Sequence, residues 1–260
     1  MNFEIFVVDN GSTDNTRKVL KEFETRDLIL VTLLEKNRGT TCARNIALKK
    51  AKGEYILILD SDTKVIPGAI ETMLGVLNKN PQIGIVAPQL VFPDDTAQQS
   101  YKKFPTVFLK ILKAVPLRFL EQAGTRLESY KFHPEEGKLY RVDYCISACW
   151  MLRREVFKKV GFFDEKIFYA PEDADYCLRV WLAGFRVVHC PKAKVLHHTQ
   201  RMTYRNKKLA KEHVKGLWYY FKKYGYWFSP ERVYQQIRET THIQHSTNRK
   251  ITACRPWKRC

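Results

Sequence analysis

The sequence lacks several features that would assign it to common functional classes. No stretch approaches the run of about 18 uncharged apolar residues that a membrane-spanning helix needs. The opening residues Met1-Asn2-Phe3-Glu4 do not begin a secretory signal. A glycine-rich phosphate-binding loop is missing near the start, and no Ser-His-Asp or Cys-His arrangement is apparent. We therefore expect a cytoplasmic chain that works without a covalent protein nucleophile.

Cysteine is present without any recognisable pairing pattern. The seven cysteines are an odd number, and none forms the CxxC motif that is typical of zinc or redox sites. We expect reduced, mostly buried thiols. The length of 260 residues and the hydrophobic content of 45% suit a single α/β domain.

Negative charge is scarce relative to positive charge. The chain has 45 Lys and Arg against 27 Asp and Glu, a formal net charge of +18. Such a charge favours anionic partners: nucleic acid, acidic lipid headgroups or phosphorylated small molecules. The basic residues gather in residues 207–225 and in the C-terminal tail, so the basic face belongs mainly to the C-terminal half. Charge alone does not separate a membrane surface from RNA.

The first 92 residues alternate between apolar runs and helix-like segments. Strands are predicted at 3–10, 28–35, 54–60 and 83–92, and helices from Ser12 or Thr13 to about Thr25, over 40–50, and from near Pro67. The apolar runs do not alternate with polar residues, which indicates that both faces of the sheet are covered. This order is typical of a Rossmann-like, mostly parallel sheet flanked by helices.

The pattern weakens after residue 92. Residues 93–140 predict a loop with one short amphipathic helix, and residues 185–198 predict one or two short strands. A helix is expected to begin near Asp173. The last twenty residues, from Thr241, are polar and basic without a sustained period, so we expect disorder there.

Acidic side chains follow two of the predicted strands directly. Asp9 ends the first apolar run, and Asp60 and Asp62 end the third. Ligands bind at the carboxyl ends of strands in an open parallel sheet. Asp60 and Asp62 could therefore hold a divalent cation that neutralises a diphosphate. The alternatives are structural: Asp62 could cap the helix near Pro67, and Asp9-Asn10-Gly11 could be an ordinary tight turn.

Four segments in fixed order carry a family resemblance. They are VVDNGSTDNT (7–16), EKNRGTTCARN (35–45), GEYILILDSD (53–62) and GFFDEKIFYAPEDADYCLR (161–179). Over roughly residues 3–198 the chain resembles glycosyltransferase family 2, the inverting nucleotide-sugar transferases. Within that family it is most similar to rhamnosyltransferase-like and other enzymes of cell-surface polysaccharide synthesis.

The resemblance implies a GT-A fold in a single domain over residues 1–240. Residues 1–92 would form the nucleotide-sugar-binding half, and 93–204 the acceptor and catalytic half. Residues 205–240 would form a basic amphipathic helical segment, followed by the tail of 241–260. Family members ordinarily begin with a further strand and helix that this chain lacks, so we expect an N-terminally truncated sheet with exposed backbone groups beside residues 3–10.

The resemblance also implies the donor site. Asp9 and Arg44 would contact the nucleotide, while Asp60 would contribute to donor binding and, with Asp62, hold Mg²⁺ or Mn²⁺. His197 would complete the metal shell. Arg44 as a solvated helical residue and His197 as a structural histidine are the alternatives.

On the acceptor side, the resemblance implies that Asp173 is the general base that takes the proton of the acceptor hydroxyl. Glu172 and Trp150 would contact the acceptor. The alternatives are an acidic helix N-terminus favoured by the helix dipole, the role we expect of Asp175, and an aromatic residue of the core.

The function expected from the resemblance is metal-dependent, inverting transfer of a sugar. The donor would be a nucleoside-diphosphate sugar and the acceptor a hydroxyl of a glycan or lipid-linked saccharide. The segment 205–225 combines basic and apolar residues, which predicts either peripheral contact with the inner face of an anionic membrane or a solvated basic helix with one core-facing stripe; nucleic acid is the less favoured partner. The alternative is an inactive, truncated homologue that acts as a basic membrane-surface or nucleic-acid-binding module.

Overall fold

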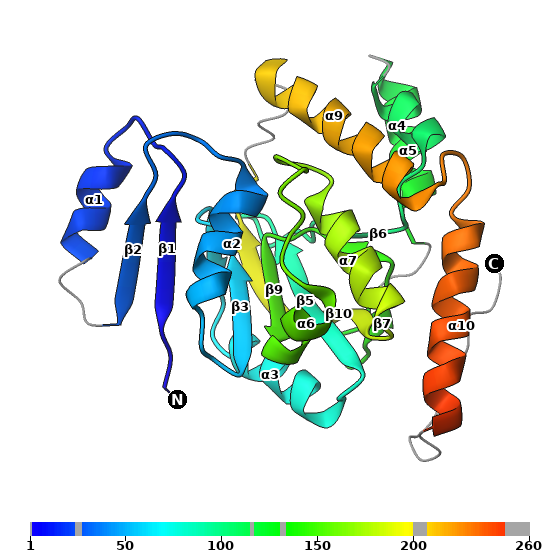
Figure 1. The fold of residues 1–260 in the computed structure, drawn as a ribbon, viewed down its shortest axis with the longest axis horizontal. Coiled ribbons are helices and arrows are strands. Elements are labelled where there is room, and N and C mark those ends of the chain that lie inside the picture. The colour runs from blue at the N-terminus through cyan, green and yellow to red at the C-terminus, as the bar shows by residue number, and fades with distance from the viewer. Residues whose placement is uncertain (1, 24–27, 115–116, 131–133, 200–206, 248–260) are drawn as a thin grey trace.

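The computed structural model describes residues 2–23, 28–114, 117–130, 134–199 and 207–247. Its first part is a separate two-stranded sheet. β1 (Ile5–Asp9) and β2 (Ile29–Leu33) run parallel, with Ile5 opposite Ile29, and α1 (Thr16–Phe23) lies beside them (Figure 1). Both strands form where the apolar runs predict them. Among the described residues β1 pairs only with β2, so its second edge makes no ladder with the main sheet.

The main sheet has the order β3-β9-β5-β10-β4, and β7 (Tyr140–Arg141) adds to β10. Its strands are β3 (Tyr55–Leu59), β4 (Thr63–Val65), β5 (Ile83–Val91), β9 (Cys149–Arg153) and β10 (Arg186–His197). β5 and β10 pair in parallel, and every residue of β5 is buried. The sheet is nevertheless mixed, because β9 runs antiparallel between β3 and β5.

Helices cover both faces of this sheet. α3 (Ala69–Lys79) packs its buried Met73 and Leu77 against one face. α7 (Glu172–Leu182) and α6 (Arg154–Val160) cover the other face, where the larger core cluster lies. α2 (Thr40–Lys50) begins where its sequence predicts. The buried, non-alternating strands follow from this double cover.

The segment between β5 and β7 contains more helix than the sequence indicates. Residues 93–140 hold α4 (Val107–Ala114) and α5 (Arg118–Glu128), and β6 (Tyr101–Lys102) pairs with β8 (Tyr144–Cys145). α9 (Lys207–Tyr224) and α10 (Glu231–Thr247) follow. The prediction of disorder from Thr241 is wrong for residues 241–247, which continue α10; residues 248–260 lie outside the described part. No helix in the described part is long and apolar enough to cross a bilayer.

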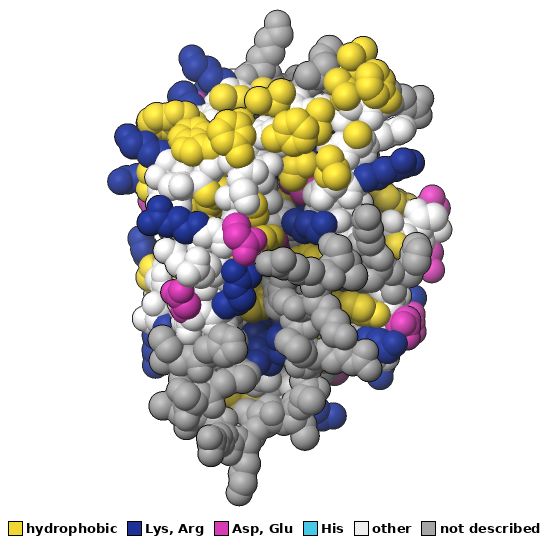
Figure 2. Space-filling view, turned by 90° about the vertical axis from the view of Figure 1, so that its right-hand side faces the viewer, with side chains coloured by type: hydrophobic (Ala, Val, Ile, Leu, Met, Phe, Trp, Pro, Cys, Tyr) yellow, Lys and Arg dark blue, Asp and Glu magenta, His cyan; other side chains and the backbone are white. Residues whose placement is uncertain are grey.

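Apolar side chains are exposed on the helices at one end of the molecule. Figure 2 shows hydrophobic side chains gathered at the top of one face, at the end where α4, α5 and α9 lie in Figure 1, with Lys and Arg at its edges. On these helices and the following loop, Trp218 is 56% exposed, Phe119 65% and Phe228 77%. An apolar surface of this kind favours an interaction partner.

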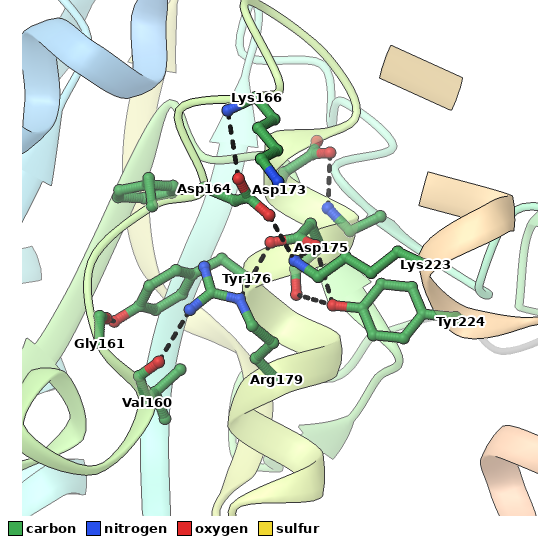
Figure 3. A network of polar contacts seen from close by, with 12 residues as sticks. Val160, Gly161, Asp164, Lys166, Asp173, Asp175, Tyr176, Arg179, Lys223 and Tyr224 are labelled. Carbon is green, nitrogen blue, oxygen red and sulfur yellow. Dashed lines mark hydrogen bonds and ion pairs between the residues drawn. The ribbon is translucent and has the colours of Figure 1, made fainter. Parts of the chain in front are cut away.

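α9 is fixed to α7 by a polar network centred on two aspartates (Figure 3). Asp175 pairs with Arg179 of its own helix and, at 2.7 Å, with Nζ of Lys223 on α9, while the hydroxyl of Tyr224 donates to it. Lys223 also reaches Asp164 at 2.7 Å. Because the Asp175 side chain is only 1% exposed, these contacts hold α9 against the start of α7 more firmly than surface pairs would.

Gly216 gives the first prediction, because it lets α9 approach the residues before α7. A β-carbon there would lie 2.1 Å from the carbonyl oxygen of Ala170. We expect Gly216→Ala to lower the free energy of unfolding by roughly 1–3 kcal/mol in urea titrations, through overpacking. The β-carbon added by Gly75→Ala in α3 would meet nothing within 4 Å. This change should raise the free energy of unfolding by roughly 0.5–1 kcal/mol. Equal effects of the two changes would contradict the close approach of α9.

Candidate active site

Asp9 lies at the end of β1 and is built into a loop. Its carboxylate accepts the backbone N–H of Ser12 at 3.1 Å and Nε of Arg17 at 3.0 Å. Burial acts against ionisation, but the hydrogen bonds from Ser12 and Arg17 lower the pKa of Asp9. Asp9 is therefore an ionised anchor at the carboxyl end of the small sheet. Arg17 was not anticipated from the sequence.

The loops that follow β1 and β2 are held together beside Asp9. The side chain of Asn10 accepts the backbone N–H of Arg38 at 2.8 Å and donates to the side chain of Asn37 at 3.1 Å. Gly11 has φ +82°, and a β-carbon there would lie 2.6 Å from the backbone nitrogen of Asn37. Only glycine fits this close approach. The DNG segment is thus a packed turn as well as a candidate nucleotide contact.

Arg44 joins distant parts of the chain. Its Nη2 donates to Oδ1 of Asp60 at 2.7 Å, and its Nη1 donates to the hydroxyl of Ser147 at 2.7 Å and lies 3.4 Å from Oε1 of Glu172. The Arg44 side chain is 11% exposed, so these partners offset the cost of burying its charge. The solvated alternative for Arg44 is wrong. The structure pairs it with Asp60 and Glu172, whereas Asp9 pairs with Arg17.

The N-terminus of α2 docks on the segment that leads to α7. The backbone N–H of Thr40 donates to the carbonyl of Phe168 at 2.8 Å, and the Thr41 hydroxyl donates to that of Ile167 at 2.7 Å. The Asn45 side chain donates to the carbonyl of Phe163 at 2.9 Å. Residues 40–45 at the start of α2 and residues 163–168 before α7 are therefore in direct contact, although they are more than 100 residues apart in the sequence. This contact positions Arg44 beside Glu172.

Asp62 and His197 face each other across the β4–β10 pair. Nε2 of His197 lies 3.6 Å from Oδ1 of Asp62, and the backbone N–H of His198 donates to the Asp62 carbonyl at 2.8 Å. The ring is oriented by Gln98. The amide of Gln98 donates to the His197 carbonyl at 2.7 Å, which leaves its oxygen 2.9 Å from Nδ1 of His197. Nδ1 therefore carries a proton and donates to this oxygen.

This arrangement fits a divalent cation. With the proton on Nδ1, Nε2 of His197 is directed at Oδ1 of Asp62 at 3.6 Å, so the two groups are placed to share a cation. A metal-ligating histidine ordinarily has its second nitrogen fixed by an acceptor, as Gln98 does here. No group of three or more His, Cys, Asp or Glu side chains that could hold a metal occurs among the described residues. Two protein ligands would leave positions for phosphate oxygens and water.

Glu172 and Asp173 begin α7 and have raised pKa values. Burial is the main cause for both, and the charge of Asp173 raises the pKa of Glu172 further. The charges of Lys102 and Arg44 act in the opposite direction on Asp173. Glu172 contacts Arg44 and Ser147, whereas Asp173 accepts only the backbone N–H of Ala174, at 2.7 Å, among hydrogen bonds within the described chain. Asp173 is therefore the carboxylate of this pair that is free to accept a proton.

Trp150 does not occupy the site. Its side chain is 0% exposed and packs in the core against the rings of Phe163 and Tyr176. The prediction that it contacts the acceptor is wrong, because the antiparallel β9 turns this residue inward beneath α7. The five cysteines of the described part are free and buried, as predicted.

Three residues that organise the site were not predicted from the sequence: Arg17, Gln98 and Ser147. Arg17 sits in a helix that reads as amphipathic and exposed. Gln98 lies in a segment without periodicity. Ser147 follows a short strand, and its hydroxyl donates to Glu172 at 3.2 Å. None belongs to a motif, and only their position in space reveals them.

Known proteins that resemble this chain are glycosyltransferases. The sequence model described as "Glycosyl transferase family 2" matches residues 1–161. The chain is 28% identical over 242 residues to the N-acetylglucosaminyl-diphospho-decaprenol L-rhamnosyltransferase of Mycobacterium tuberculosis (strain CDC 1551 / Oshkosh), covering 88% of this chain and 78% of that protein. A 73-residue segment, 28% of this chain and 29% of the relative, is 44% identical to the putative teichuronic acid biosynthesis glycosyltransferase TuaG of Bacillus subtilis (strain 168).

Solved structures share the fold. GalNAc-T7 with UDP, GalNAc and Mn²⁺ superposes with a TM-score of 0.57 at 23% identity, over 75% of this chain and 37% of that one. The mannosyltransferase PcManGT from Pyrobaculum calidifontis, in complex with GDP-Man and Mn²⁺, superposes with a TM-score of 0.55 at 18% identity. The match covers 92% of this chain and 60% of that one. The chain thus spans less than two thirds of these structures. The predicted α/β GT-A fold is confirmed.

The burial of Arg44 gives the second prediction. Arg44→Met leaves the buried Ser147 and Glu172 without the hydrogen bonds of the guanidinium, so we expect the free energy of unfolding to fall by roughly 2–3 kcal/mol in urea titrations. The matched control on the same helix is Lys49→Met. Lys49 and Glu165 form an exposed pair at 3.8 Å, and its loss should cost about 0.5 kcal/mol or less. Equal stability of the two variants would show that Arg44 does not hold the site together.

Proposed function

The chain belongs to glycosyltransferase family 2, and we propose that it transfers a sugar from a nucleoside-diphosphate sugar to an acceptor hydroxyl, with inversion and with a divalent cation. One observation carries this proposal: Arg44 joins Asp60, at the end of β3, to Glu172, the neighbour of Asp173. Asp60, on the proposed donor side, and Glu172, next to the proposed base Asp173, therefore both contact the guanidinium of Arg44. A single displacement needs the donor and the base to be held in such a fixed relative position.

The donor side of the proposal uses the ends of β1 and β3. Asp9 and its loop would contact the nucleotide, while Asp60 would hold Arg44 near the diphosphate. Asp62 and His197 are the residues that would hold the cation; the prediction that Asp60 is a further ligand is not carried forward, because its Oδ1 accepts Nη2 of Arg44 at 2.7 Å. When bound, Mg²⁺ or Mn²⁺ offsets the negative charge that develops on the departing diphosphate. The related structures with UDP or GDP-mannose and Mn²⁺ support a nucleotide-sugar donor and a divalent metal, without deciding between Mg²⁺ and Mn²⁺.

The acceptor side uses Asp173. Its carboxylate accepts the proton of the acceptor hydroxyl as that oxygen attacks the anomeric carbon from the face opposite the diphosphate. Burial raises the pKa of Asp173, which makes its carboxylate a stronger base than that of an ordinary aspartate. Glu172, held by Arg44 and Ser147, would position Asp173 and contribute to acceptor binding.

The acceptor is proposed to be a glycan or lipid-linked saccharide of a cell-surface polysaccharide. Two relatives support this class: one is named as a rhamnosyltransferase of N-acetylglucosaminyl-diphospho-decaprenol, and the other as a putative glycosyltransferase of teichuronic acid biosynthesis. The exposed Trp218 and Phe119 among basic residues favour peripheral contact with an anionic membrane, so we propose a cytoplasmic protein at the inner face of the membrane.

The cation site gives the third prediction. Asp62→Asn removes one of two proposed ligands, so the affinity for Mn²⁺ in the presence of UDP or GDP should fall at least tenfold in calorimetry. Asp95→Asn, the same change at an exposed position outside the site, should bind as the wild type does. Unchanged Mn²⁺ affinity in Asp62→Asn would place the cation elsewhere. Removal of the metal with EDTA should abolish transfer in every variant.

The general base gives the fourth prediction. Asp173→Asn should lower kcat for transfer by roughly 100-fold or more, with nucleotide affinity retained. Because Asp173 must be ionised and burial raises its pKa, kcat of the wild type should fall with decreasing pH at a value above the ordinary aspartate pKa of about 4. A pH–rate profile of kcat measures this. Transfer that is indifferent to Asp173→Asn would favour a basic binding module over an enzyme.

A further inference from the structure

A second group of basic side chains lies near Asp173 and has no part in the mechanism above. Its members are Lys102 on β6 and Lys110 and Lys113 on α4, arranged around Glu128 of α5; we call it the lysine cluster. Nζ of Lys110 lies 2.8 Å from one oxygen of Glu128, and Nζ of Lys113 lies 2.6 Å from the other. The hydroxyl of Tyr144 donates to the same carboxylate at 3.3 Å.

Glu128 cannot neutralise the whole cluster. Its side chain is 1% exposed, and although burial opposes ionisation, the charges of Lys110 and Lys102 hold its pKa far below the usual range. It is therefore a single fixed negative charge. Lys110 and Lys113 together already exceed it by one positive charge, and Lys102 adds another.

Lys102 is the member without a direct partner. It stands opposite Tyr144 in the antiparallel β6–β8 pair, so both side chains lie on the same face of that pair, the face that carries Glu128. Within the described chain the Lys102 ammonium makes no hydrogen bond and no ion pair within 4 Å. Burial lowers its pKa while Glu128 raises it. Burying an ammonium group without a paired anion costs free energy, so this position favours the binding of an anion.

The lysine cluster adjoins the proposed base. β8 packs against α7, and Ser147, two residues beyond β8, donates to Glu172 at 3.2 Å. The charges of Lys102 and Lys110 are close enough to act on Asp173. From α9, His213 faces the same cluster; burial and the lysines lower its pKa to about 4, so the ring is neutral at pH 7 and can donate a hydrogen bond.

We propose that the lysine cluster binds a phosphate or diphosphate group carried by the acceptor, an inference that rests on the proposed function. An acceptor sugar linked to such a group would place its hydroxyl toward Asp173 and its anionic group on Lys102, Lys110 and Lys113. The outer face of α4 exposes Phe108 and Ile111. The same helix thus offers cations on its inner side and an apolar surface outside, which suits a diphosphate attached to a lipid.

The test compares two acceptors that share the saccharide and the lipid and differ in the diphosphate: a saccharide linked to a prenyl diphosphate, and the same saccharide as the neutral glycoside of that prenol. We expect Lys102→Met to lower the ratio of their kcat/KM values at least tenfold, because a hydrogen bond to a charged group is lost. Changes in Asp173 or in folding affect both acceptors and cancel in the ratio. Lys103→Met is the matched control, since this neighbouring lysine lies over the ring of Tyr130. Lys102→Arg keeps the positive charge, so it should retain the wild-type ratio of the two kcat/KM values.

A direct measurement separates this inference from the proposed function. Inorganic pyrophosphate is titrated by calorimetry in EDTA, where no cation supports the donor site. Weaker binding to Lys102→Met than to Lys103→Met supports the site even if no transfer is observed. Equal binding to both variants, or an unchanged ratio of acceptors, overturns it. If Lys102→Met instead reduces only binding to vesicles of anionic phospholipid, the cluster holds a lipid headgroup and the acceptor assignment is wrong.

Discussion

The guanidinium of Arg44 is the interaction on which the site depends. It is buried between Asp60, Ser147 and Glu172, three residues that come from different parts of the chain. A buried cation requires such partners, because its desolvation is otherwise uncompensated. The same partners define the site: Asp60 ends the third strand, and Glu172 begins the helix that carries Asp173. The charge of one side chain thereby fixes the relative positions of the donor and acceptor groups.

The two sides of this arrangement have different electrostatics. On the donor side, Asp9 is ionised and hydrogen-bonded, and Asp62 faces a histidine whose tautomer Gln98 sets. On the acceptor side, Glu172 and Asp173 have raised pKa values because they are adjacent and buried. Environments that separate the pKa values of carboxylates are a means of giving them separate roles. In the proposed mechanism, the carboxylates of the donor side would face the nucleotide and its cation, and the carboxylate of Asp173 would accept the proton of the acceptor hydroxyl.

Much of this could be predicted from the sequence. The apolar runs predicted β1, β2, β3 and β5, whereas the three-residue β4 has no such run. The DNG and DSD segments marked the ends of β1 and β3. The ordered motifs led to Asp60, Asp62 and Asp173. The tertiary pairing of antiparallel β9 could not be foreseen, so Trp150 was misplaced, and the separation of β1 and β2 from the main sheet was only partly anticipated. Gln98, Ser147 and the lysine cluster carry no local pattern, because their roles arise from contacts between distant segments.

The most direct test of the account is a crystal structure with Mn²⁺ and whichever of UDP or GDP binds, with the metal located by its anomalous scattering. The account predicts a metal peak in contact with both Asp62 and His197, a base beside the Asp9 loop, and a terminal phosphate between the metal and Asp173. A metal bound away from Asp62 and His197, or a nucleotide whose phosphates point away from Asp173, would contradict it.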